Sequence, residues 1–248
     1  MTGDLYIGTS GWAYAHWRGP FYPADLPDGK LLEYYCRHFR CVEINSSFYH
    51  LPGRHAVEQW RDTTPDGFLF TAKASRYITH MKKLKDPQQS VAAFFERITL
   101  LGEKLGPILF QLPPRWRCNP QRLESLLVIL DPAYRYAFEF RDPSWINDEI
   151  LELLQRHDAA FCIYHLAGYQ SPLHVTTDFV YLRLHGPDGA YQGRYDQRTL
   201  SDWARRITEW TEEGRDVYCF FDNDEAGYAV INARELGSLI NNVKQQPG

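Results

Sequence analysis

The sequence predicts an α/β protein of the (β/α)8, TIM-type barrel class, on three observations. Short β-branched and aromatic runs alternate with longer amphipathic runs along all 248 residues, as in repeated βαβ units. Eight of these short runs occur, which matches the strand number of the barrel. No Ser- or Gly-rich linker, low-complexity tract or sequence repeat divides the chain. We therefore expect a single domain over residues 1–248.

The expected strands are bounded by turn-forming residues. They lie at 5–8, 41–45, 68–73, 107–112, 135–140, 160–164, 179–185 and 217–222. The clearest helices span 87–106, 200–214 and 224–242, and the first two end near a glycine. Residues 166–178 contain too many turn formers for a helix. An open doubly wound sheet is the rival fold, but the G-x-G-x-x-G expected after its first strand is absent.

Composition limits the compartment and the partners. The formal net charge of -4 argues against a general nucleic-acid or membrane binder, although a local basic patch remains compatible with it. The 5 cysteines are odd in number and form no C-x-x-C pair, which indicates neither a disulfide framework nor a structural zinc site. The N-terminus resembles no signal peptide, and no segment is long and apolar enough to span a bilayer. We expect a cytoplasmic protein that does not associate with membranes.

Polar and charged residues recur at two-residue spacing near the ends of the expected strands. Side chains alternate between the two faces of a strand, so the apolar residues pack on the outer helices and the polar ones point into the barrel. The inward set comprises Glu43, Asn45, Thr71, Lys73, Glu139, Arg141, Arg183 and His185. The last strand ends in Asp222 and Asn223, and its pattern does not decide which points inward. Active sites of TIM barrels lie at these strand ends, so we expect the set to converge at one mouth.

Two interpretations of this set stay open. A buried charge is stable only with a partner or a ligand, so the set could be a structural ion-pair network that caps the core. The mixture of signs favours chemistry, because the cations would bind an anion while the carboxylates exchange protons. The expected catalytic residues are Glu43, Glu139 and His185. The expected substrate-binding residues are Asn45, Lys73, Arg141, Arg183, Trp12, Tyr191 and Asp222.

The loops after the strands add three features. The first loop carries aromatic residues that either stack on a ligand or cover the barrel: Trp12, Tyr14, His16, Trp17 and Tyr22. The loops after strands three and four form a basic rim of Arg76, Lys82, Lys83, Lys85, Arg115 and Arg117, with Asp86 as its acid. The loop after strand seven contains Gly186, Gly189 and Gly193, which suit either backbone phosphate binding or a flexible lid.

Six segments also carry a family resemblance. They are IGTSGWAYAHWRGPFYP (7–23), VEINSSFY (42–49), LGPILFQLPP (105–114), FEFRDPSW (138–145), YLRLHG (181–186) and FFDND (220–224). Together they resemble the signature blocks of the YecE-like family, domain of unknown function 72, over nearly the whole chain. The resemblance implies a TIM-type barrel and no particular activity. It falls on the residues that strand parity selects. The chain departs from the family pattern at Asp222, where relatives often have asparagine, and at His165, where they often have an acidic residue. The resemblance therefore supports no metal or acid/base role at these two positions.

The sequence therefore predicts a hydrolase-like enzyme that acts on an anionic substrate by carboxylate acid/base catalysis. The substrate would carry a phosphate or carboxylate and be sugar-like or nucleotide-like. The alternatives are a non-catalytic nucleic-acid or anion binder and a metal-dependent phosphodiesterase. A divalent metal on Glu43, Glu139, His185 and Asp222 is not favoured, because neighbouring cations would repel it. The sequence leaves both the cofactor and the oligomeric state open.

Overall fold

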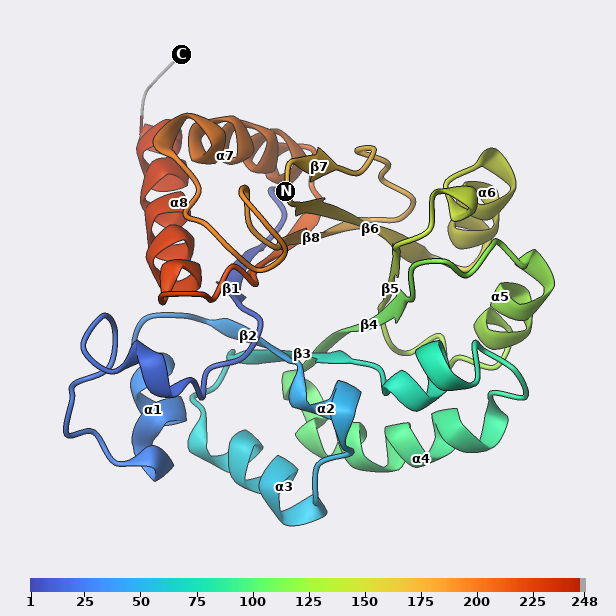
Figure 1. Cartoon of the computed structure of the whole chain (residues 1–248), viewed down its shortest axis with the longest axis horizontal. Helices are drawn as coiled ribbons and strands as arrows, with labels where there is room; N and C mark the ends of the chain where they lie inside the picture. The colour runs from blue at the N-terminus through green and yellow to red at the C-terminus, as the bar shows by residue number, and fades with distance from the viewer. Residues whose placement is uncertain (246–248) are drawn as a thin grey trace. The chain divides into compact units, whose positions relative to one another are not determined.

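A computed structural model describes residues 1–245 of the chain, with strands and helices in alternation (Figure 1). All eight expected strands are confirmed, with bounds shifted by one or two residues. The strands are β1 (Leu5–Thr9), β2 (Cys41–Ile44), β3 (Leu69–Lys73), β4 (Leu105–Leu112), β5 (Tyr136–Phe140), β6 (Ala159–Leu166), β7 (Tyr169–Gln170), β8 (Phe179–Leu184) and β9 (Asp216–Phe221). The additional strand, β7, lies in the turn-rich segment after β6 and pairs with it in antiparallel fashion.

Helices follow most of the strands. The α-helices are α1 (Leu31–Tyr35), α2 (Ser46–Tyr49), α3 (Arg54–Thr63), α4 (Gln88–Ile98), α5 (Pro120–Leu127), α6 (Asp148–Arg156), α7 (Gln197–Glu212) and α8 (Tyr228–Gln245). The shorter helical turns are η1 (Ala15–Trp17), η2 (Asp28–Lys30), η3 (Tyr77–Met81), η4 (Thr99–Lys104) and η5 (Pro143–Trp145). Side-chain caps mark several N-termini: Asp196, for example, accepts a hydrogen bond of 2.7 Å from the Thr199 amide at the start of α7.

The helix expected over 87–106 is shorter than the sequence pattern suggests. Its regular part, α4, ends at Ile98, and the chain continues as the tighter turns of η4. Gly102 has φ +59, in the left-handed region that glycine adopts without strain, and breaks the helical path there. Leu105 and Gly106 already belong to β4. The apolar periodicity thus runs on past the point where glycine ends the regular helix.

The sheet has the order β1-β9-β8-β6-β5-β4-β3-β2, with β7 attached to β6. The pairs β1/β9, β8/β9, β3/β4, β4/β5 and β5/β6 are parallel. Parallel strands in this order, connected by helices, make the fold class the predicted (β/α)8, TIM-type barrel. The described chain divides into two compact units, so a single domain over 1–248 stays a prediction.

Unit 1 comprises residues up to Val42, Ile163–Leu173 and the described residues from Asp178 onward. Within it α7 and α8 lie side by side (Figure 1). The buried stripe of α7 recurs at helical spacing through Leu200, Trp203, Ala204 and Ile207. A Cβ at Gly8 of β1 would lie 2.4 Å from the Cys41 carbonyl oxygen, so only glycine fits there. Close backbone packing of this kind fixes the strand ends that carry functional side chains.

Unit 2 comprises Glu43–Cys162 and His174–Thr177. The helices α3 to α6 lie on the outer side of its strands (Figure 1). Stacked aromatic rings fill the space beneath them: Phe110 and Phe138 have ring centroids 5.3 Å apart, and so do Phe140 and Trp145. Among the residues that the structure describes in either unit, no helix is long and apolar enough to cross a membrane.

Candidate functional site

The predicted site residues fall into two groups, one in each unit. The unit 2 cluster contains Glu43, Asn45, Lys73, Glu139 and Arg141. The unit 1 cluster contains Arg183, His185 and Asp222, with Trp12 and Tyr191 in its loops. The charged and amide residues lie at or just beyond the carboxyl ends of their strands, whereas Trp12 and Tyr191 lie further along the loops that follow β1 and β8. Convergence of the two groups at one mouth stays a prediction.

Glu139 is the centre of the unit 2 cluster. It is fully buried on β5, and the strand register places it opposite Gln111 of β4. The Gln111 Nε2 donates a hydrogen bond of 2.6 Å to Glu139 Oε1, and the Arg141 guanidinium forms an ion pair with the same oxygen. The Cys162 thiol lies 3.8 Å from Oε2. A carboxylate with this many donors is held in one orientation, as catalytic and structural carboxylates alike require.

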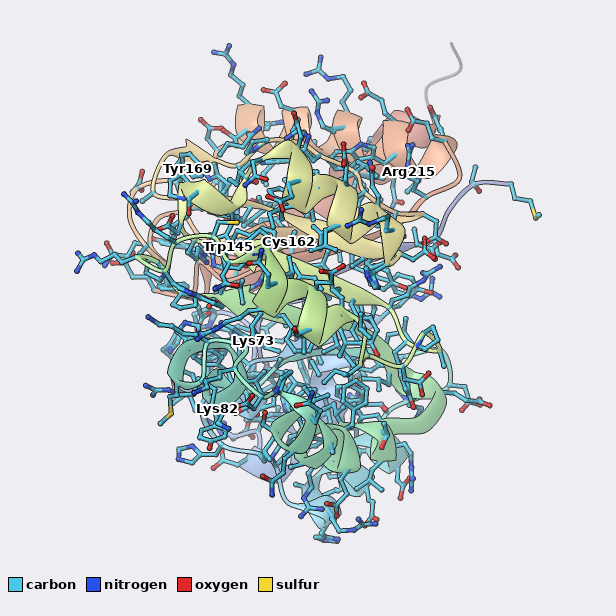
Figure 2. All side chains as sticks on the ribbon, turned by 90° about the vertical axis from the view of Figure 1, so that its right-hand side faces the viewer. Lys73, Lys82, Trp145, Cys162, Tyr169 and Arg215 are labelled. Atoms are coloured by element: carbon cyan, nitrogen blue, oxygen red, sulfur yellow. The ribbon has the colours of Figure 1, made fainter. Side chains whose placement is uncertain are left out.

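Lys73 is the buried cation of the same cluster. Its ammonium lies 4.2 Å from the centre of the Phe48 ring, and its side chain is 7% exposed. The Ser47 hydroxyl donates a hydrogen bond of 2.6 Å to the Lys73 carbonyl and so ties the start of α2 to the end of β3. Lys73 is buried, whereas Lys82, which follows η3, is only half-buried; both are labelled in Figure 2. The charge of Lys73 is thus placed at the strand end rather than on the surface.

His80 reports the sign of the electrostatic potential around this cluster. Its pKa is lowered to about 4, mainly by burial and then by the charges of Lys73, Arg76 and Arg141, while Glu139 opposes the shift. The cations therefore outweigh the carboxylate at the imidazole. Sequence reasoning missed His80, although its place in η3 after a strand ending in lysine was a usable signal.

Glu43 and Asn45 are also positioned at a strand end. Glu43 is fully buried in β2, and Asn45 is half-buried directly before α2. Their strand-end positions agree with the parity argument. Their roles as acid/base and orienting residue stay predictions.

In unit 1, an ion-paired network joins the ends of β8 and β9. Asp222 Oδ2 accepts hydrogen bonds from Arg183 Nη2 at 3.1 Å and from His185 Nδ1 at 3.0 Å. Arg183 Nη1 lies 3.3 Å from His185 Nε2, so both imidazole nitrogens have partners. The sequence did not decide whether Asp222 or Asn223 points toward the other polar side chains. In the structure Asp222 does, whereas Asn223 donates a hydrogen bond to Asn232 instead. The His185 ring thus holds the Asp222 carboxylate from one side, and its catalytic role stays a prediction.

A cavity of about 390 Å³ lies beside this network. It is lined by His16, Ala190, Tyr191, Gln192, Asp222, Asp224 and Glu225. Asp224 forms an ion pair of 3.0 Å with His16 Nε2 and accepts a hydrogen bond from Trp17 Nε1. Burial, together with the charge of Asp222, raises the pKa of Asp224 to about 6. The sequence reading treated Asp224 only as part of a family block and did not assign it a role.

The loop aromatics separate into two kinds. Trp17 and Tyr22 are fully buried and pack against neighbouring rings, so they cover the core. Trp12 is half-buried, and Tyr191 is 46% exposed at the cavity. Of the two readings that the sequence left open, the structural cover holds for Trp17 and Tyr22.

The glycine-rich loop after β8 is folded onto itself. The amide of Gly186 donates to the Tyr195 hydroxyl at 3.0 Å, and that of Gly193 donates to Glu225 at 3.3 Å. A Cβ at Gly186 would lie 2.1 Å from the Gln192 carbonyl oxygen. These two glycines serve close chain packing, and their amides are used within the chain rather than offered to phosphate. Within residues 1–245, no group of three or more His, Cys, Asp or Glu side chains has an arrangement that could hold a metal ion.

Comparison with known proteins shows the family. The family model described as "Protein of unknown function DUF72" matches residues 6–247. The chain belongs to the DUF72 family. The resemblance seen in its sequence blocks is thereby confirmed, and the family assignment itself carries no activity.

DUF72 relatives extend over most of the chain. The UPF0759 protein YunF of Bacillus subtilis is 28% identical, and the match covers 95% of this chain and 94% of YunF. The UPF0759 protein YecE of Escherichia coli K12 is 32% identical over 57% of this chain, and the match spans 50% of YecE.

Solved DUF72 structures confirm the fold. A crystal structure of a family member from Thermotoga maritima has a TM-score of 0.87 at 30% identity and covers 96% of this chain and 99% of its own. A crystal structure of a family member from Enterococcus faecalis has a TM-score of 0.82 at 18% identity, and the match covers 96% of this chain and 95% of the other.

Proposed function

We propose that this protein is a hydrolase-like enzyme for a small anionic substrate, with the anion bound at the unit 2 cluster. The substrate carries a phosphate or carboxylate on a sugar-like or nucleotide-like body. One observation supports this most directly: Lys73, Arg76 and Arg141 surround His80 and add to the lowering of its pKa by burial, against the single opposing charge of Glu139. A site with this excess of positive charge attracts anions and stabilises them after desolvation.

The proposed roles divide the unit 2 cluster by charge. Lys73 and Arg141 bind the anionic group, and Arg76 adds positive charge near His80. Glu139 exchanges a proton with the substrate, and Gln111 keeps its carboxylate in one orientation. Glu43 and Asn45 remain proposed as a second carboxylate and an orienting amide. When the anion binds, Arg141 shifts part of its interaction from Glu139 to the ligand, which leaves the carboxylate freer to accept a proton.

In unit 1, Arg183 is proposed to contribute positive charge and His185 to assist proton transfer through Asp222. Because both ring nitrogens of His185 have partners, the geometry supports the orienting role better than direct transfer. Trp12 and Tyr191 are the proposed aromatic contacts. A cytoplasmic location is also proposed, and the five cysteines, all present as free thiols, suit a reducing compartment.

The test is turnover against a panel of sugar phosphates, nucleoside monophosphates and 4-nitrophenyl phosphate, followed by released phosphate. Glu139→Gln keeps the shape of the side chain and should lower kcat by about 10² to 10⁴-fold, while substrate affinity changes little. Lys73→Met should instead weaken binding. Glu152→Gln, an exposed acid on α6, is the matched control and should leave both unchanged. Full turnover by a folded Glu139→Gln protein would contradict the proposal.

A second candidate is a non-catalytic binder of nucleic acid or another anion, and the basic rim favours it. Arg76, Lys85, Arg115 and Arg117 are exposed, and Lys82 Nζ lies 5.8 Å from the ring centre of the exposed Tyr77. Such a surface pairs phosphate contacts with a stacking ring. Under this reading Lys82→Ala and Lys83→Ala weaken salt-sensitive binding of single-stranded DNA, and no substrate in the panel is turned over.

A further inference from the structure

The cavity beside β9 contains a pair of carboxyl groups in contrasting environments. Asp222 and Asp224 both line it, and they are two residues apart after the strand. Asp222 is held by the Arg183 guanidinium and the His185 ring, which favours its ionised form. Asp224 is 14% exposed and has no arginine or lysine ion-pair partner within residues 1–245. Burial and the charge of Asp222 disfavour its ionised form and raise its pKa to about 6, while the contacts with Trp17 and His16 oppose that shift.

Carboxyl groups that share a site but differ in protonation divide the work of an acid and a base. The protonated member can donate to a departing oxygen while the ionised member stabilises positive charge on the carbon that loses it. His16 Nε2 and Trp17 Nε1 hold the two oxygens of Asp224 in place. The cavity is within the volume range of small-molecule sites, and the exposed Tyr191 ring supplies an apolar wall for a sugar face.

The charges that face the cavity select the ligand. Asp222, Asp224 and Glu225 line it together with His16 as its titratable base. The positive charge of Arg183 reaches it only through the ion pair with Asp222. An anionic group such as phosphate would be repelled here, whereas hydroxyl groups can bond to the carboxylates and to Gln192. The cavity therefore suits an uncharged polyhydroxyl ligand.

We propose that this cavity binds an uncharged glycoside and that Asp224 is its general acid. In the step, the Asp224 carboxyl donates its proton to the glycosidic oxygen as the bond from that oxygen to the anomeric carbon breaks. The bonding electron pair leaves with the oxygen, and Asp222 stabilises the positive charge that develops on the sugar. Water then adds to the anomeric carbon and returns a proton to Asp224. The net reaction is hydrolysis of one glycosidic bond, and it uses unit 1 residues alone.

The experiment measures kcat/KM across pH on a panel of uncharged 4-methylumbelliferyl glycosides. The wild-type protein should lose activity as pH rises through about 6, because Asp224 gives up its proton there. Asp224→Asn should lower the rate by about 10² to 10⁴-fold. Asp222→Asn should move the alkaline limb of the profile to lower pH, since the charge of Asp222 raises the pKa of Asp224. His16→Gln should move it to higher pH, for the opposite reason.

The matched control is Asp202→Asn, an exposed acid of α7, whose rate and profile should equal those of the wild type. Near-ultraviolet circular dichroism verifies that each variant is folded. The inference is overturned if the wild-type protein hydrolyses none of the uncharged glycosides. It is also overturned if a folded Asp224→Asn protein hydrolyses them at the wild-type rate. These outcomes are separate from those of the Glu139 and Lys73 variants on phosphate substrates, which test the unit 2 cluster.

Discussion

The unit 2 cluster and the unit 1 cavity occupy equivalent places, the carboxyl ends of their strands, but differ in charge. In unit 2, burial lowers the pKa of His80, and the charges of Lys73, Arg76 and Arg141 lower it further while Glu139 opposes them. In unit 1, Asp222 helps to raise the pKa of Asp224 to about 6. Burial is the largest cause of both shifts, since it disfavours the charged form of each group, so the two regions differ in the neighbouring charges: cations around His80 and the Asp222 carboxylate beside Asp224. Strand-end position alone makes a site possible, and the local charge balance decides which ligand it can take.

The largest expected effect comes from removing a buried ion-pair partner in unit 1. Arg183 is fully buried and pairs with Asp222. Arg183→Met should lower the free energy of unfolding by about 3–5 kcal/mol, because it leaves the Asp222 charge without its guanidinium. Urea unfolding measures this. Arg205→Met breaks an exposed pair with Asp202 and should change stability by less than about 1 kcal/mol. Equal effects of the two changes would show that the Asp222 network is not desolvated.

Asp224 should make stability fall as pH rises. Its folded pKa is raised, so its stabilising contribution is complete below pH 4 and is lost as pH rises through about 6. The shift corresponds to about 3 kcal/mol. Asp224→Asn should remove this loss, measured as the difference in unfolding free energy between pH 4 and pH 7. Asp202→Asn is the control and should keep the wild-type difference. If Asp224→Asn also keeps the wild-type difference, the raised pKa of Asp224 is contradicted.

His80 should act in the opposite sense and more weakly. Its folded pKa is lowered, so its contribution is present above pH 6.5 and is lost as pH falls toward 4. Because the ring is partly exposed, solvent screening reduces the effect to about 1–2 kcal/mol. His80→Gln should flatten the stability profile over this range in thermal unfolding. If the variant follows the wild-type profile, the pKa of His80 is not lowered in the folded protein.

The smallest effect is expected at the basic rim. Lys82→Ala should change the free energy of unfolding by less than about 0.5 kcal/mol, because the residue is only half-buried and its ammonium lies 5.8 Å from the centre of the exposed Tyr77 ring. Its effect should instead appear as weaker, salt-dependent binding of polyanions. A large loss of stability would mean that the rim is a structural element of unit 2.

Strand parity predicted much of the fold and part of the site. The two-residue spacing correctly selected Glu139, Arg183 and His185 as buried groups, because alternation is a local property of the chain. It could not separate Asp222 from Asn223, since both end a strand and only tertiary contacts to Arg183 and Asn232 decide their directions.

The residues that sequence reasoning missed depend on contacts distant in the chain. Asp224 acquires its raised pKa from burial, and its two hydrogen-bond partners come from a loop about 200 residues away. His80 acquires its lowered pKa mainly from burial and then from cations, including Lys73 and Arg141 on other segments. Propensity and spacing describe neither of these environments. The sequence therefore locates strand ends but does not give the balance of charge around each side chain.

The most direct test of the anion cluster is a nuclear magnetic resonance titration of His80 with and without inorganic phosphate. A bound anion offsets the charges of Lys73, Arg76 and Arg141, so phosphate should raise the pKa of His80 from about 4, by roughly half a unit to one unit. Lys73→Met should reduce this response. A pKa for His80 that is the same with and without saturating phosphate would contradict the account.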